Sequence, residues 1–219
     1  MTVLQAKNIH KIFKKPDNLH ILKGIDLELK HNESIAIMGA SGVGKTTLLH
    51  ILGTLESFNT GSLNILNNTT LKDEIRNKHI GFIFQSYNLL EDLTLLDNIL
   101  MPARIARKKV TATSEAYKRA NLLLEEVGLE NRKNYLAKNL SGGERQRAAI
   151  ARAFCNDPDI ILADEPSGNL DFDNSNIIHN LLINSVKKFN KSLIVATHDK
   201  KLASLCDKIY YLENGKLTT

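Results

Sequence analysis

The chain has 219 residues, of which 42% are hydrophobic and 24% are charged. This length and composition give one ordinary domain or two small ones with enough apolar sequence for a buried core, and they exclude disordered and fibrous classes. Lys and Arg number 29 against 24 Asp and Glu, and the resulting net charge of +5 fits acidic lipid, nucleic acid or nucleotide phosphates equally well.

No apolar run approaches the ~20 residues that a bilayer span needs, and the first residues carry no signal-peptide core. We therefore expect a chain that neither crosses a membrane nor enters the secretory pathway. Cys155 and Cys206 have no Cys-x-x-Cys or Cys-His cluster near them, which argues against a disulfide framework and a structural zinc site. A reducing cytosol is the expected environment.

The predicted elements begin with strands. Residues 3–13 and 19–29 read as two hairpin-like strands, and a short apolar strand at 34–38 runs directly into a glycine. An apolar helix is expected at 47–52. These elements predict two paired strands followed by one buried strand and a helix.

The middle of the chain predicts helix. Within 95–128, apolar residues recur at i, i+4, i+7, i+8 and i+11, which indicates an amphipathic helix closed by Gly128. The residues of this stripe are Ala116, Ala120, Leu123, Leu124 and Val127.

The last third alternates helix and strand, which predicts a parallel sheet covered by helices. The expected elements are helix 143–155, strand 160–163, helix 174–188, strand 193–197, and a final strand 208–212 with an edge hairpin to 216–217. No internal repeat or long linker is present in the sequence. We expect a single domain over 1–219, in which 1–86 and 141–219 form an α/β core and about 87–140 form an inserted helical subdomain.

One glycine-rich segment fits G-x-x-x-x-G-K-[ST] between the strand at 34–38 and the helix that follows. In this context backbone N–H groups and the helix N-terminus can surround phosphate oxygens, Lys45 can neutralise β and γ oxygens, and the Thr46 hydroxyl can bind Mg²⁺. The candidate nucleotide-binding residues are Gly39, Ala40, Ser41, Gly42, Val43, Gly44, Lys45, Thr46 and Thr47.

A second motif is the apolar strand at 160–163 that ends in Asp164 and Glu165. Asp164 is placed to hold the magnesium shell, and Glu165 can accept a proton from water that attacks the γ-phosphate. The alternative is a solvated acidic pair that caps the next helix. The guanine-reading Asn-Lys-x-Asp pattern is absent from the sequence, so the motifs do not indicate a GTPase.

The segment 140–147, Leu-Ser-Gly-Gly-Glu-Arg-Gln-Arg, resembles the signature motif of the ATP-binding-cassette (ABC) ATPases. The other motifs of that family follow in order across nearly the whole chain. The resemblance implies a P-loop ABC ATPase fold with a mainly parallel core sheet, an antiparallel β subdomain and an inserted α-helical subdomain. It also implies that Gln85 is the Q-loop ligand, with a catalytic and a metal-binding role. Glu165 is implied as catalytic base, Asp171 as an interface residue and His198 as the γ-phosphate switch.

Ser141 is a good N-cap before two glycines, so the signature segment itself predicts a second anion site at a helix N-terminus. The residues of this second site are Ser141, Gly142, Gly143 and Glu144. In the ABC family the second site belongs to the opposite protomer, so the resemblance implies a homodimer that sandwiches ATP and Mg²⁺. The alternative is an ordinary capped helix.

The remaining assignments concern adenine stacking, the metal ligands and the other histidines. Phe13 fits the place where the family stacks an aromatic ring on adenine, and ordinary core packing is the alternative. Thr46, Gln85 and Asp164 make up the expected metal set. The remaining histidines lack metal spacing and are interpreted as structural: His10, His20, His31, His50, His79 and His179.

Within the family, the segment 84–102 is similar to a bacterial group that serves lipoprotein release, macrolide or peptide export and cell division. Met101 and Pro102 favour the lipoprotein-releasing ATPases, which implies release or translocation of lipoproteins from the inner membrane. The implied partners are integral membrane permease subunits, which dock on 85–101, and the implied location is the cytoplasmic face of the inner membrane. Leu89 and Leu90 could instead be core.

Two alternative functions stay open. One is the ATPase of a non-transporting cell-division or cell-wall complex, or of a peptide or drug exporter. The other, a soluble ABC ATPase that acts on ribosomes or DNA, is disfavoured because the chain has one cassette. The basic residues at 104–109 and 187–188 also lack interleaved aromatics, so no nucleic-acid partner is expected.

Overall fold

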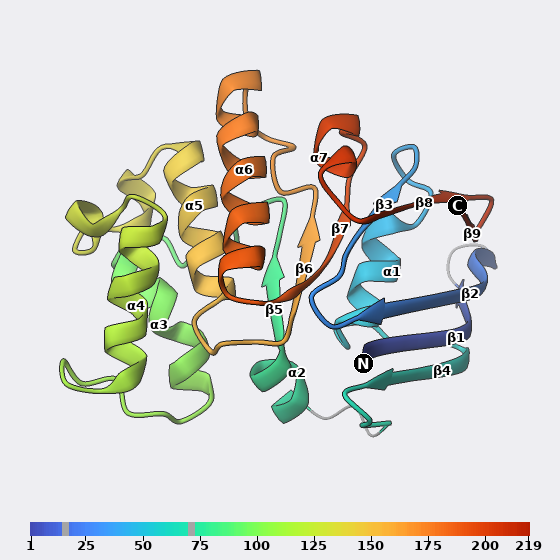
Figure 1. Cartoon of the computed structure of the whole chain (residues 1–219), viewed down its shortest axis with the longest axis horizontal. Coiled ribbons are helices and arrows are strands. Elements are labelled where there is room, and N and C mark those ends of the chain that lie inside the picture. Colours follow the sequence, from blue (N-terminus) through green and yellow to red (C-terminus); the bar gives the residue numbers. More distant parts are fainter. Residues whose placement is uncertain (15–17, 70–72) are drawn as a thin grey trace.

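The computed structural model describes residues 1–14, 18–69 and 73–219. Its strands form two sheets, and the helices lie around the larger sheet (Figure 1). The smaller sheet is antiparallel and has the order β2-β1-β4; its strands are β1 (Thr2–Phe13), β2 (Leu19–Lys30) and β4 (Thr60–Ile65). The two hairpin-like strands expected from the sequence are thus present, and β4 joins them as a third strand.

The larger sheet has the order β5-β6-β7-β3-β8-β9. Its strands are β3 (Ser34–Met38), β5 (Ile80–Ile83), β6 (Ile160–Asp164), β7 (Ser192–Ala196), β8 (Lys208–Glu213) and β9 (Lys216–Thr218). Strands β5, β6, β7, β3 and β8 run parallel, and β9 pairs antiparallel with β8 at the edge. Every residue of β3, β6 and β7 is buried, as expected for strands covered on both faces.

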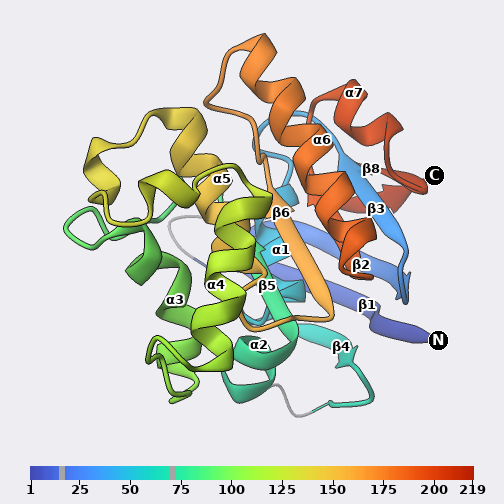
Figure 2. The same ribbon diagram turned by 60° about the vertical axis from the view of Figure 1, so that its left-hand side comes forward.

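Side chains of the central strands alternate between two cores. Ile35 and Ile37 pack with α1 (Lys45–Leu52) and the antiparallel sheet, whereas Ala36 and Met38 pack with the helices on the other face. Those helices are α3 (Leu95–Ile105), α4 (Glu115–Glu126), α5 (Gly142–Ala153) and α6 (Phe172–Lys188). Figure 2 brings α3 and α4 forward on the left, away from the N-terminus, which is marked on the right.

In the middle of the chain, the structure differs from the expected helix in one respect. The stretch 95–128 holds two helices, because α3 ends before Arg107, whose φ of 55° is left-handed, and Ser114 then caps α4 by accepting from Tyr117 N. The apolar periodicity belongs to α4 alone. Short elements without a strong sequence pattern complete the chain: α2 (Asp73–His79), α7 (Lys200–Ser204) and the 3₁₀ turns Glu130–Arg132 and Ala137–Asn139.

None of the helices in the described ranges is long and apolar enough to span a bilayer.

Candidate functional site

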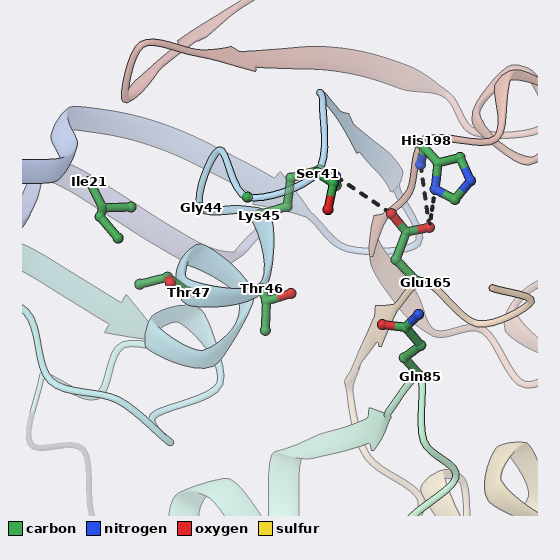
Figure 3. Close-up of a pocket in the computed structure, with 10 residues that line it drawn as sticks. Ile21, Ser41, Gly44, Lys45, Thr46, Thr47, Gln85, Glu165 and His198 are labelled. Carbon is green, nitrogen blue, oxygen red and sulfur yellow. Dashed lines mark hydrogen bonds and ion pairs between the residues drawn. The ribbon is translucent and has the colours of Figure 1, made fainter. Parts of the chain in front are cut away.

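A cavity of about 470 Å³ opens where the loops that follow β3, β5, β6 and β7 converge (Figure 3). Ligands of open α/β sheets collect at this carboxyl edge of the strands. The lining residues are Ile21, Ser41, Gly42, Gly44, Lys45, Thr46, Thr47, Gln85, Glu165 and His198. The structure therefore brings residues from four of the predicted motifs to one cavity.

The glycine-rich loop joins β3 to α1 as the motif predicts. Gly44 precedes α1 with a φ of 107°, and a Cβ at this position would lie 2.5 Å from Ile21 Cγ2. Only glycine fits both the left-handed backbone and the close approach. No side chain caps α1, so its first N–H groups and its positive dipole end are available to an anion in the cavity.

Lys45 is the cation of this site. Its side chain is 7% exposed, and Nζ donates to the carbonyl oxygens of Gly39 at 2.9 Å and Ala40 at 3.1 Å. The same ammonium lies 3.5 Å from Glu165 Oε1. The loop's own carbonyls thus hold the ammonium at the cavity wall, where it can reach both a phosphate and the carboxylate.

Glu165 lies between Lys45 and His198. Its Oε2 is 3.0 Å from His198 Nδ1 and accepts a longer hydrogen bond of 3.4 Å from His198 N. The backbone of Glu165 is left-handed, with a φ of 42°, while its N–H donates to Ala196 O at 2.9 Å. This bond continues the pairing between β6 and β7, so the strained residue is fixed by the sheet and its carboxylate is aimed into the cavity.

Asp164, one residue earlier, points to a metal site. Its side chain is 5% exposed, and Oδ1 has no hydrogen-bond partner in the described chain. Burial raises the pKa of this carboxyl, and the side chain of Thr46 opposes the shift. Asp164 does not line the cavity itself, but Thr46, whose side chain contacts it, and Gln85 both do. The carboxylate, the hydroxyl and the amide offer oxygen donors of the kind that suits Mg²⁺. Within the described ranges, no group of three or more His, Cys, Asp or Glu side chains is placed to hold a metal ion.

The signature segment forms the N-terminus of α5, as predicted. Ser141 Oγ accepts from Glu144 N at 3.3 Å, and the Glu144 carboxylate accepts from Ser141 N at 2.8 Å, a capping box. The hydrogen bond from the Ser141 backbone lowers the pKa of Glu144. None of the residues 141–144 lines the cavity at Lys45, so the predicted second anion site lies apart from that cavity within one chain.

Asp171 lies beside the signature segment. It caps α6 by accepting from Asn174 N at 2.9 Å, and the Asn174 amide oxygen would lie 3.3 Å from a Cβ added at Gly143. The side chain of Asp171 is exposed. The predicted interface residue and the predicted second anion site therefore share one surface.

Phe13 stays a prediction. It ends β1 half-buried, with Lys11 Nζ 4.7 Å from its ring centre, and it is not among the residues that line the cavity. The connection after it contains residues 15–17, which lie outside the described residues. Ile21 of β2 lines the cavity and carries no motif that the sequence could have offered.

Sequence reasoning also missed residues that hold the Gln85 loop. Asn169 Nδ2 donates to Gln85 O at 2.9 Å. Arg152 of α5 donates to Tyr87 O at 2.6 Å and also to Asn88 O, two consecutive residues with left-handed backbones. Burial lowers the pKa of Arg152 to about 10, so the guanidinium remains charged at neutral pH.

This fold and this loop define a P-loop nucleotide-binding protein. The chain matches the family model described as ABC transporter over residues 22–168. It is 50% identical over 218 residues to the lipoprotein-releasing system ATP-binding protein LolD of Protochlamydia amoebophila (strain UWE25), which covers 98% of this chain and 96% of that protein. The corresponding protein of Bacteroides fragilis (strain YCH46) is 43% identical over 216 residues, 96% of this chain and 99% of its own length.

Solved structures agree with these relatives. A dimeric bacterial ABC transporter cassette superimposes with a TM-score of 0.88 at 37% identity, covering 99% of this chain and 97% of that one. A dimeric post-hydrolysis state of the same cassette, bound to ADP and Pi, superimposes with a TM-score of 0.87 at 37% identity and the same coverage. The chain belongs to the ABC transporter family, and the expected ABC ATPase fold is confirmed.

Proposed function

We propose that this chain is the ATP-hydrolysing subunit of a membrane complex that releases or translocates lipoproteins from the inner membrane. The observation that carries the proposal is the similarity to lipoprotein-releasing relatives over nearly the full length of both chains. The geometry supports the chemistry, because a buried lysine, a carboxylate and a histidine meet at an uncapped helix N-terminus.

In this proposal the residues divide the work of ATP hydrolysis. The loop 39–47 binds the phosphates, Lys45 neutralises their charge, and Glu165 takes a proton from the attacking water. His198 orients that carboxylate and contacts the γ-phosphate. Thr46, Gln85 and Asp164 would hold Mg²⁺, and the bound ion would supply charge neutralisation on the phosphate oxygens.

The second anion site suggests how two chains cooperate. Ser141, Gly142, Gly143 and Glu144 lie apart from the cavity of their own chain, so they are free to face the nucleotide of another copy. ATP binding would then join two chains head to tail, with Asp171 at the same interface. Homodimerisation of this chain is part of the proposal; the solved relatives are dimeric cassettes.

A groove next to the Gln85 loop is the proposed docking site for the membrane subunits. It has a volume of about 410 Å³ and lies between β5, α2, α3 and the end of α5. Its apolar lining includes the stacked rings of Phe82 and Phe84, 4.6 Å apart, together with Leu55, Met101, Pro102 and Ile105. Arg152 lines the same groove and holds the backbone of 87–88, so movement of the Gln85 loop reaches the groove directly.

In this proposal the chain is a peripheral subunit at the cytoplasmic face of the inner membrane, held there by permease subunits. Leu90 is 51% exposed, which argues against the alternative that it belongs to the core, while Leu89 packs partly against the core. A nucleic-acid partner is not part of the proposal.

Depletion of this chain from its native cells tests the proposed substrate. Outer-membrane lipoproteins should accumulate in the inner membrane, as measured by fractionation of the two membranes. Correct lipoprotein sorting together with filamentous, undivided cells would overturn the proposal in favour of a division complex. Re-expression of the wild-type chain is the control, and it should restore sorting.

A further inference from the structure

His179 is a buried imidazole in the middle of α6. Only 1% of its surface is exposed, which is uncommon for a polar side chain. Its Nε2 lies 2.7 Å from Ser167 Oγ and 4.0 Å from Asp199 Oδ2, and its Nδ1 has no hydrogen-bond partner in the described chain. The contacts of this ring are therefore directed to one side, toward two loops.

The first of these loops carries the proposed catalytic base. Ser167 stands two residues after Glu165, in the connection 165–171 between β6 and α6. The far end of this loop is fixed to α6 by the Asp171 cap, and the Gly168 N–H donates to Glu165 O at 3.0 Å. The bond between Ser167 and His179 attaches the middle of the loop to the same helix.

The second loop carries His198. Asp199 follows it directly and caps α7 by accepting from Lys201 N at 2.7 Å and Leu202 N at 3.0 Å. Helices α6 and α7 lie side by side in both views (Figures 1 and 2). His179 therefore lies between the two loops at their helix side, while Glu165 and His198 join them at the cavity side.

The protonation of the ring follows from its surroundings. Burial lowers the pKa of His179, so the ring is neutral at neutral pH. The nearby Asp199 carboxylate favours the tautomer with hydrogen on Nε2, which then donates to Ser167 Oγ. The other tautomer would leave a buried Nδ1–H without an acceptor, which is costly.

We propose that His179 is a positioning residue of the ATPase site, which sets the placement of Glu165 relative to His198 by linking Ser167 to α6 beside Asp199. It does not touch the cavity itself. Its removal should therefore change the rate of turnover more than the binding of nucleotide. The inference concerns the hydrolysis site and does not depend on which substrate the complex moves.

The test compares kcat, KM and thermal stability of the purified full-length chain. His179→Leu should lower kcat about fivefold, the factor that one hydrogen bond of ordinary strength supports, with KM for ATP within twofold of wild type. His179→Gln, which offers an amide N–H near the place of Nε2, should recover most of the lost kcat. Ser185→Ala is the matched control, because Ser185 is a buried residue of the same helix whose hydroxyl has no partner in the described chain.

Ser167→Ala tests the same bond from the other side. It should lower kcat about as much as His179→Leu, and the double variant should lose no more than either single variant, because both remove one interaction. Additive losses, an equal loss in Ser185→Ala, or normal kcat in Ser167→Ala would overturn the proposal. If His179→Leu does not fold, the Ser167→Ala result decides alone.

Discussion

His198 Nδ1 lies 3.0 Å from Glu165 Oε2, and the His198 backbone N–H points to the same oxygen at 3.4 Å. The histidine is 72% exposed, whereas the carboxylate is 13% exposed. An exposed side chain thus covers a half-buried one at the mouth of the cavity. In the proposed mechanism, this arrangement would let His198 orient the carboxylate on one side and face a phosphate on the other.

His198→Ala should therefore lower kcat and leave nucleotide binding nearly intact. Loss of one hydrogen bond to a charged group corresponds to about 10- to 100-fold in rate. Steady-state ATPase assays and equilibrium binding of a fluorescent ATP analogue measure the two effects. His31→Ala, which changes an exposed histidine outside the site, is the control. Equal loss of binding and turnover would contradict the assignment.

If residues 141–144 form a second anion site that serves another copy of the chain, two differently inactivated chains should complement one another. Lys45→Ala disables the cavity of one chain, and Ser141→Arg places a bulky cation at the second site, so each variant alone should be inactive. A mixed dimer retains one complete site, and mixing the two variants should restore up to about half of the ATPase rate per dimer. If neither mixtures nor covalently linked pairs exceed the single variants, the arrangement in trans is wrong.

If the segment 85–101 contacts the membrane partner, a change at an exposed residue of this segment should impair recruitment without impairing folding. Leu90 does not line the groove, but it is an exposed apolar side chain of the predicted docking segment 85–101. Leu90→Asp should therefore abolish association with the membrane complex if this segment also contacts the partner, and it should leave the melting temperature and ATP binding unchanged. Co-purification with native membranes measures recruitment. Leu122→Asp is matched in exposure, 47% against 51%, but lies on α4 outside the docking segment, and it should remain recruited. Unfolding of Leu90→Asp would instead support a core role.

The hydrogen bonds from Ser34 to the Asp207 carboxylate should make a pH-dependent contribution to the free energy of unfolding. Hydrogen bonds from Ser34 Oγ at 2.6 Å and Ser34 N at 2.8 Å, the hydroxyl bond first, lower the pKa of Asp207 in the folded chain. The stabilisation is therefore present above the unfolded carboxyl pKa and is lost as pH falls through the lower folded value. Ser34→Ala should lower the free energy of unfolding by about 1 kcal/mol at most at pH 7, because Asp207 is exposed and solvent weakens its interactions.

Urea unfolding across pH measures this difference. The gap between wild type and Ser34→Ala should narrow as pH falls below about 4, where the unfolded carboxyl takes up its proton. A gap that stays constant from pH 7 to pH 3 would show that Asp207 is not the partner responsible.

Much of the fold could be predicted because strong patterns sit on buried elements. The strand at 34–38 has the predicted bounds, since a short apolar run before a glycine-rich loop leaves little choice. The split of 95–128 into α3 and α4 could not be predicted, because it depends on the left-handed Arg107 and the Ser114 cap. The helix–strand alternation predicts that the sheet is parallel, whereas the order in which β6 pairs with β5 and β7 is a tertiary outcome that no local pattern indicates.

The candidate site also contains some residues that the sequence predicts and others that it cannot. Lys45, Gln85, Glu165 and His198 meet at one cavity because each motif lies at the end of a parallel strand. Ile21 reaches the cavity from the other sheet, which no local pattern can indicate. For His179 the sequence indicates only a structural role, because its contact with Ser167 depends on the packing of α6 against the loop.

Replacement of Glu165 by Gln tests the central claim, that this cavity hydrolyses ATP with Glu165 as the base. The amide keeps the shape of the side chain but cannot take a proton, so phosphate release from Mg-ATP should fall about 10²–10⁴-fold while ATP binding persists. The variant should then accumulate as an ATP-bound dimer, measured by light scattering with and without nucleotide. Turnover within a few fold of wild type would contradict the account and show that another group acts as the base.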